Sequence, residues 1–180
     1  RAMIFASFSV FFALTKKYDL ILSSSGPISV GLPLVMAKIF RRKKTVFEVR
    51  DLWPWGGIEM GLITNKIMKK LGLWFEKICY KKSDLLITAS PGQRDHINER
   101  FLGLPIEVIP NASDNYLFEK KTTNKLPIWA EGKIILSHIG SLGFIHNIPF
   151  WVDVAFQINK RYPSNNFMFV FIGDGANKTD

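Results

Sequence analysis

The chain has 180 residues, 47% of them hydrophobic, and carries 24 basic against 15 acidic side chains for a net charge of +9. This apolar content supports a core and excludes a disordered polypeptide. The single cysteine, Cys79, excludes a disulfide framework and cysteine-based zinc sites, and it fits a reducing compartment.

The first part of the chain alternates patterns typical of helices and strands. We expect helices at residues 3–17, from Pro27 to about 40, at 65–82 and at 91–101, and strands at 19–23, 45–49, 84–89 and 106–109. The helix at 65–82 has one apolar stripe, which places Cys79 in the core. The stripe consists of Ile67, Met68, Leu71, Trp74, Phe75, Ile78 and Cys79.

Helix and strand boundaries are marked by turn and capping residues. The Gly56-Gly57 segment predicts a loop, and Ser90–Gln93 has the spacing of a capping box with Pro91 at the first helical position. His96 is expected on an exposed part of the next helix, where it would only be solvated.

The second part begins after a polar, irregular stretch at residues 115–131. A strand at 133–139, a glycine turn, a helix at 149–160 and a strand at 167–172 follow it. Strands that alternate with helices predict an α/β fold with a parallel sheet and right-handed crossovers. Because this pattern is cut at both ends, we expect the chain to be a fragment of a longer protein.

The basic surplus lies mostly in residues 1–118, which hold 17 basic and 10 acidic side chains for a net charge of +7. Such a surface can meet nucleic acid, anionic lipid or phosphate-bearing substrates. We expect no nucleic-acid partner, because no recognised binding motif accompanies the charge. We expect peripheral binding to anionic membranes instead, through the apolar residues 3–14 with Lys16, Lys17 and 41–44 nearby. The apolar run itself is shorter than the roughly 20 residues of a membrane-spanning helix.

A charge cluster ends the second strand of the first part. The run Phe47–Pro54 places Glu48, Arg50 and Asp51 at the strand's carboxyl end and stops on a Trp-Pro turn. Ligands of open α/β sheets bind beyond the carboxyl ends of the strands. Asp51 can therefore orient or deprotonate a hydroxyl, and Arg50 can hold a phosphate. The alternative is a structural ion pair, in which Arg50 binds Asp51 or Glu48 and ties the strand to its loop.

Two glycine turns follow the strands of the second part. Glycine between a strand and a helix lets backbone N–H groups approach a diphosphate, so we predict a nucleotide site there. Neither turn completes a dinucleotide-binding fingerprint or a P-loop. Asn147 is alternatively a cap for the helix that Pro149 begins. The residues predicted to bind the nucleotide are Gly140, Ser141, Gly143, His146, Gly173 and Gly175.

The order and spacing of several short motifs resemble a family 4 glycosyltransferase. The resemblance covers nearly the whole chain and is strongest to the bacterial members that build capsule, colanic acid or O-antigen chains. The motifs are Phe47–Pro54, Phe75-Glu76 with Tyr80, Ser90–Gly92, Pro110–Asp114, Gly140–Gly143 and Ile172–Gly175.

The resemblance implies a GT-B architecture, in which two Rossmann-like α/β domains face a cleft. Residues 1–118 would form most of the acceptor domain, 119–131 a linker, and 132–180 the beginning of the second, donor-binding domain. The donor would be a UDP- or GDP-linked sugar, transferred with retention and without a metal or other cofactor. The family's paired glutamates contact the donor sugar, and we expect them beyond the fragment because Glu131 is the last glutamate here.

Within that pattern, Arg50 stands where the wider family often has a histidine, and Arg50-Asp51 is similar to the capsule branch. His146 is the candidate for the basic residue that many members place after the first glycine turn. The catalytic residues implied are Asp51 and Arg50, with no metal ligand.

The resemblance thus implies a hexosyltransferase-like enzyme of cell-surface polysaccharide synthesis. It would act peripherally at the cytoplasmic face of the membrane, on a lipid-diphosphate-linked or oligosaccharide acceptor. Two alternatives stay open: a non-catalytic α/β module that binds a membrane or partner, and another GT-B enzyme such as a nucleotide-sugar epimerase. We expect the 180-residue piece alone to be inactive, since it lacks most of the donor domain.

Overall fold

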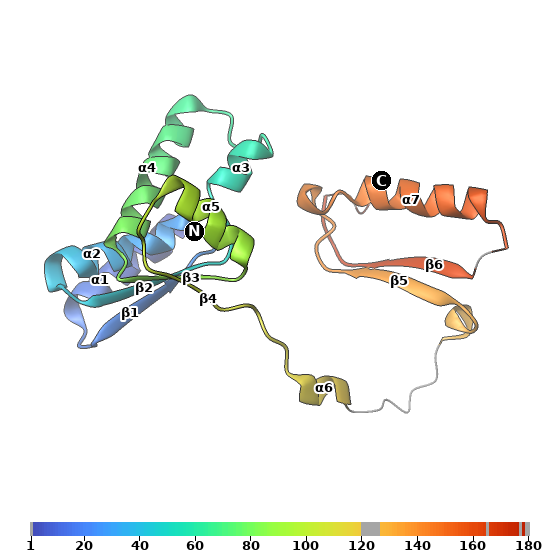
Figure 1. Ribbon diagram of the computed structural model, residues 1–180, viewed down its shortest axis with the longest axis horizontal. Coiled ribbons are helices and arrows are strands. Elements are labelled where there is room, and N and C mark those ends of the chain that lie inside the picture. Colours follow the sequence, from blue (N-terminus) through green and yellow to red (C-terminus); the bar gives the residue numbers. More distant parts are fainter. Residues whose placement is uncertain (1, 120–126, 165, 177, 179–180) are drawn as a thin grey trace. The chain divides into compact units, whose positions relative to one another are not determined.

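The computed structural model describes residues 2–119, 127–164, 166–176 and 178. It divides into two compact units, Arg1–Asp114 and Asn115–Asp180, which are described separately (Figure 1).

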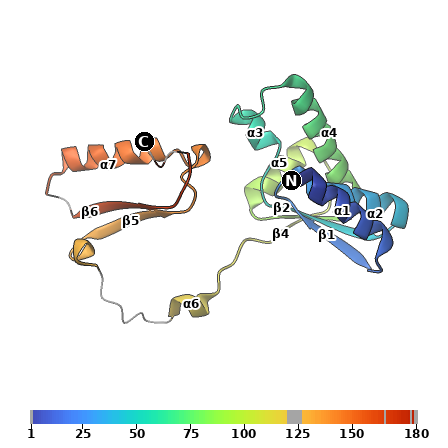
Figure 2. The same ribbon diagram turned by 180° about the vertical axis from the view of Figure 1, so that it is seen from behind.

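The first unit is a four-stranded parallel sheet covered by helices. The strands are β1 (Leu20–Ser24), β2 (Lys44–Val49), β3 (Leu85–Thr88) and β4 (Ile106–Val108), in the order β1-β2-β3-β4. Each crossover leads to the next strand, so right-handed connections bring the helices to one face (Figures 1 and 2). The helices are α1 (Ala2–Thr15), α2 (Gly31–Arg41, after the 3₁₀ turn η1, Ile28–Val30), α3 (Trp55–Glu59), α4 (Lys66–Lys82) and α5 (Pro91–Arg100).

The second unit is a βαβ arrangement. Strands β5 (Ile134–Ile139) and β6 (Phe167–Ile172) are parallel neighbours, and α7 (Ile148–Arg161) connects them after the 3₁₀ turn η3 (Phe144–His146). Helix α7 lies along this pair of strands (Figure 1). The helices and strands predicted for both parts of the chain are therefore confirmed, as is the Rossmann-like α/β fold of the first unit.

Two segments predicted to be irregular contain short helices. Gly56 and Gly57 lie in α3, not in an open loop. The irregular stretch predicted at residues 115–131 includes α6 (Asn115–Glu119) and the 3₁₀ turn η2 (Ile128–Ala130), and its residues 120–126 lie outside the described residues.

The core of the first unit lies between the sheet and α2, α4 and α5. Phe47 and Val49 of β2 are fully buried against it. A Cβ on Gly31 would lie 2.3 Å from the Cys79 Sγ atom, so glycine permits α2 to approach α4 closely. Burial raises the pKa of the Cys79 thiol to about 12, as expected for a core thiol and not a nucleophile.

Helix α4 meets this core with a different side from the one its sequence predicts. Its buried residues are Glu76, Cys79 and Tyr80. Four residues of the predicted apolar stripe point away from the core and are between 58% and 69% exposed, namely Ile67, Met68, Leu71 and Trp74. The prediction of one core-facing stripe is therefore wrong for most of the helix, because burial of Glu76 turns the stripe outward.

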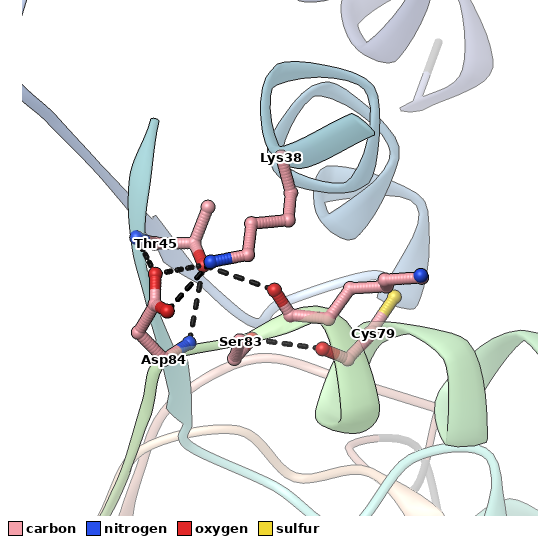
Figure 3. Close-up of polar contacts among 6 residues, drawn as sticks. Lys38, Thr45, Cys79, Ser83 and Asp84 are labelled. Carbon is pink, nitrogen blue, oxygen red and sulfur yellow. Dashed lines mark hydrogen bonds and ion pairs between the residues drawn. The ribbon is translucent and has the colours of Figure 1, made fainter. Parts of the chain in front are cut away.

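A polar cluster fixes the amino ends of β2 and β3, opposite the edge where ligands of such sheets bind. Asp84 Oδ1 lies 2.6 Å from Lys38 Nζ, and the Thr45 N–H donates to Asp84 Oδ2 at 2.8 Å (Figure 3). The hydrogen bond from Lys38, with those from Thr45, lowers the pKa of the Asp84 carboxyl. The cluster thus joins α2 to both strands (Figure 3).

Replacement of Asp84 is predicted to destabilise the fold in a pH-dependent manner. The folded pKa of Asp84 is depressed, so its contribution is present above the unfolded value of about 3.9 and is lost as the pH falls through the folded pKa. Asp84→Asn should lower the free energy of unfolding by about 1 kcal/mol at neutral pH, a modest cost because the side chain is partly exposed. Urea unfolding at pH 7 and pH 3 measures this difference, and an equal difference at both pH values would contradict the assignment.

Candidate functional site at the carboxyl edge of the first sheet

The carboxyl ends of the four parallel strands meet at one edge of the first unit. Arg50 and Asp51 follow β2 there, and both are exposed. The turn that follows β1 contributes Ser25, which is buried. The segment that follows β3 contributes Ser90 and Gln93 at the start of α5. The fold thus brings three separate stretches of sequence to the edge where ligands of open α/β sheets bind.

The backbone of Arg50 is held from both sides. Its N–H donates to Ser25 Oγ at 2.9 Å, and its carbonyl accepts from Gln93 Nε2 at 2.8 Å. Ser25 is itself fixed, because its own N–H donates to the Glu48 carbonyl at 2.8 Å. The backbone that carries the charged side chains is therefore anchored to both neighbouring strand ends.

The side chains of Arg50 and Asp51 are not used to hold the fold. Among the described residues, neither forms an ion pair with the other, and Arg50 forms none with Glu48. The alternative of a structural ion pair is therefore wrong for the described part of the chain. A fixed backbone with an uncommitted cation and carboxylate is suited to a ligand that brings an anion and a hydroxyl.

Gln93 links the capping of α5 to this site. The predicted capping box is confirmed in part, because the Gln93 N–H donates to Ser90 Oγ at 3.3 Å. The Gln93 side chain accepts from the Ala89 N–H at 2.9 Å, while its amide nitrogen reaches Arg50. Sequence reasoning missed Gln93 and Ser25 as positioning residues. The capping spacing identified Gln93 as a local cap, but nothing in the sequence revealed its bond across the sheet.

The loop after Asp51 turns sharply and is anchored by packing. The Trp53-Pro54 peptide bond is cis, and the Trp53 N–H donates to the Asp51 carbonyl at 2.8 Å. A Cβ on Gly57 would come within 2.5 Å of the Trp53 ring. A Cβ on Gly72 of α4 would lie 3.0 Å from Pro54 Cγ. Helix α4 therefore packs against the loop at a position where glycine permits close approach.

A buried ion pair supports α3 beyond this loop. Arg100 binds Glu76 through two contacts, Nη2 to Oε2 at 2.6 Å and Nη1 to Oε1 at 3.2 Å. Glu76 is fully buried, and the Arg100 guanidinium lies 4.7 Å from the centre of the Trp55 ring. Burial, followed by the charge of Glu76, raises the pKa of Tyr80. The pair therefore connects α4 and α5 to the segment that follows Asp51.

His96 belongs to the same cluster. Its ring centre lies 5.3 Å from that of Trp55, and its Nε2 atom is 3.4 Å from Arg100 Nη1. The prediction that His96 is only solvated is therefore wrong, since the side chain is half-buried against α3.

The glycine turns of the second unit contact each other, as their strand positions predict. The Gly140 N–H donates to the Ile172 carbonyl, and the Leu142 N–H donates to the Asp174 carbonyl, both at 2.9 Å. A Cβ on Gly173 would lie 1.7 Å from the Gly140 oxygen, so no side chain fits between the turns. A Cβ on Gly175 would likewise lie 2.6 Å from the Leu142 carbonyl carbon, so Gly173 and Gly175 are required by the packing of the turns themselves, apart from any role toward a ligand.

The other predicted nucleotide-binding residues lie beside these turns. Ser141 and His146 are exposed, and the His146 ring centre is 5.3 Å from that of His138, which sequence reasoning did not assign to the site. Asn147 occupies the N-cap position of α7, as predicted, but its backbone is left-handed with φ of 46° and its side chain forms no capping hydrogen bond. Within the described residues, no group of three or more His, Cys, Asp or Glu side chains is placed to hold a metal ion.

Loss of either member of the buried pair is predicted to destabilise the first unit strongly. Glu76→Ala or Arg100→Ala leaves the other charge without its partner, which costs about 3–5 kcal/mol of the free energy of unfolding. Glu99→Ala, at an exposed position of α5, should change it by less than about 0.5 kcal/mol. Denaturant unfolding followed by circular dichroism measures both. Glu76→Gln removes the charge but keeps the size of the side chain, so it should destabilise the unit less than Glu76→Ala does. If the Glu76 variants were as stable as Glu99→Ala, the buried ion pair would not stabilise the first unit.

Comparison with known proteins identifies the family of this unit. A family model described as Glycosyltransferase Family 4 matches residues 1–115, which include the whole four-stranded sheet and the Arg50-Asp51 edge. A search of curated proteins finds no match. The family match covers more than half of the chain and agrees with its parallel, Rossmann-like sheet. The chain therefore belongs to Glycosyltransferase Family 4, and its function is of the glycosyltransferase type.

Proposed function

We propose that this protein transfers a sugar from a UDP- or GDP-linked donor to a lipid-diphosphate-linked or oligosaccharide acceptor in cell-surface polysaccharide synthesis. The reaction takes place at the cytoplasmic face of the membrane, with which the protein associates peripherally. The observation that carries the proposal is the Arg50-Asp51 pair, which is exposed on an anchored backbone at the carboxyl edge of a family 4 domain.

Arg50 and Asp51 act on the acceptor in this proposal. The Arg50 guanidinium binds an acceptor phosphate, for which its planar set of N–H donors is suited. Asp51 orients the acceptor hydroxyl and takes its proton as the acceptor oxygen bonds to the anomeric carbon. The bond from that carbon to the donor diphosphate breaks in the same transfer, and the nucleoside diphosphate leaves. The family resemblance favours retention of configuration at that carbon, which requires the acceptor oxygen to approach on the same face from which the diphosphate leaves.

The glycine turns of the second unit serve the donor in this proposal. Gly140, Ser141 and Gly143 form one turn, and Gly173 and Gly175 the other, and both follow carboxyl ends of parallel strands. Backbone N–H groups at such turns suit a diphosphate. His146, exposed beside the first turn, supplies a donor for the same phosphates.

Substitutions at the acceptor edge should lower turnover without lowering stability. In the product of the complete gene, Arg50→Ala and Asp51→Asn are each expected to reduce sugar transfer by about a hundredfold or more, because each removes a positioned electrostatic or acid–base group. Both side chains are exposed and have no ion-pair partner in the described chain, so the urea midpoint should stay unchanged. Transfer is measured with a panel of UDP- and GDP-sugars and lipid-diphosphate acceptors.

A matched control is available on α5. Arg94 and Asp95 form an exposed ion pair at 2.9 Å, so Arg94→Ala and Asp95→Asn remove the same charges at a neighbouring place in the fold. These variants should retain normal turnover. Near-normal turnover by Arg50→Ala and Asp51→Asn, or losses equal to those of the α5 variants, would refute the assignment of the acceptor site.

A further inference from the structure

The side of α4 that faces away from the sheet is apolar and exposed. We call it the α4 outer face, and it consists of Ile67, Leu71 and Trp74, with the partly buried Ile78 at one end and the lysines beside them, Lys66, Lys70, Lys77, Lys81 and Lys82. Ile67 and Trp74 are 69% and 60% exposed. Two hollows of about 460 Å³ each lie between these apolar and lysine side chains along the helix. An exposed patch of large apolar residues on an ordered helix indicates an interaction surface.

The charged side chains on the exposed side of this helix are all positive. Residues 66–82 contain six lysines and a single acidic residue, Glu76. Glu76 is fully buried on the opposite side of the helix and is neutralised by Arg100. The α4 outer face therefore presents apolar side chains bordered by positive charge, without a carboxylate of its own helix to oppose an anionic surface.

We propose that the α4 outer face docks the protein on an anionic lipid bilayer. A helix that lies in the plane of a membrane interface buries large apolar side chains, often with tryptophan, and keeps lysines at the level of the lipid phosphates. Ile67, Leu71 and Trp74 supply the apolar side chains, and the bordering lysines supply the cations. The charge complementarity selects an anionic lipid surface over a neutral one.

Helix α1 is the less suitable docking surface, although the sequence predicts membrane contact there. Its exposed phenylalanines, Phe5, Phe8, Phe11 and Phe12, are as apolar as the α4 outer face. Its range Ala2–Thr15 contains no charged residue, and Lys16 and Lys17 lie together after its last turn, so cations do not border the exposed side along its length as they do on α4. No helix in the described part of the chain, α1 included, is long and apolar enough to cross a membrane.

Docking through α4 would place the membrane next to the proposed acceptor site. The helix runs from the carboxyl end of β2 back to the amino end of β3, so its first half, with Ile67 and Leu71, is the half nearer the carboxyl edge. Gly72 contacts Pro54 in the loop that follows Asp51. A lipid-linked acceptor would then reach the Arg50-Asp51 edge from the bilayer. The delivery of a lipid-linked acceptor to this edge rests on the proposed function, whereas the docking of α4 on the bilayer does not.

Vesicle binding by the 180-residue chain tests the docking surface. The parent chain should co-sediment with vesicles of phosphatidylcholine and phosphatidylglycerol, less at high salt, and much less with phosphatidylcholine alone. The double variant Lys70→Gln with Lys77→Gln should lower the partition coefficient about 30-fold. The matched control, Lys16→Gln with Lys17→Gln at the end of α1, should bind as the parent does. Brominated lipids should quench tryptophan emission in the parent and much less in Trp74→Phe.

The outcomes separate this inference from the proposed function, because lipid binding needs no sugar transfer. Binding by the α4 double variant equal to that of the parent overturns the inference, as does loss of binding only in the α1 variant. Failure of the parent to bind anionic vesicles also overturns it. If the chain binds vesicles through α4 but the full-length protein transfers no sugar, the proposed function is refuted and the docking surface stands. Circular dichroism checks that each variant is folded.

Discussion

The burial of Glu76 determines how α4 sits on the sheet, and much of the first unit depends on that orientation. A carboxylate taken out of water needs a partner, and Arg100 of α5 supplies two contacts to it. The helix therefore turns Glu76, Cys79 and Tyr80 inward. Its most apolar side is left outside, where it forms the α4 outer face. One ion pair thus sets both the packing of two helices and the character of an exposed surface.

The same ion pair reaches the candidate acceptor site through aromatic contacts. The Arg100 guanidinium lies over Trp55, which begins α3 directly after the Trp53-Pro54 turn. The Arg50 backbone is fixed independently by Ser25 and Gln93. The segment from Arg50 to Trp55 is therefore held at both ends by groups from other elements, while the side chains of Arg50 and Asp51 stay exposed. A binding site requires such a fixed backbone with side chains left accessible to the ligand.

The sequence predicted most of the architecture because alternating apolar runs and turn residues are local signals. The strands around Phe47 and Phe169, and the cap at Ser90, follow from such signals. Apolar periodicity failed at α4, since a hydrophobic stripe does not reveal that a carboxylate on the opposite side has a buried partner 24 residues away. The family resemblance drew attention to Glu76, but its ion pair with Arg100 is a tertiary contact.

The candidate site was predictable in its charged residues and not in its supports. Arg50 and Asp51 stood out because they follow a buried strand, whereas the bonds from Ser25 and Gln93 join positions 25 and 43 residues apart from Arg50. Asn147 was recognised as a cap by its spacing alone. Its backbone is left-handed, and its side chain forms no capping hydrogen bond. His96 read as a surface residue because its contact with Trp55 depends on the fold of the intervening segment.

The central claim is that the carboxyl edge of the first sheet binds the acceptor, and a backbone amide titration by nuclear magnetic resonance tests it most directly. A water-soluble, short-chain prenyl diphosphate sugar would be added to the isotopically labelled 180-residue chain. The account predicts saturable shifts at the amides of Ser25, Arg50 and Asp51, which surround the edge. Shifts confined to the amino edge around Thr45 and Asp84, or shifts absent from the Arg50 segment at saturating acceptor, would contradict it.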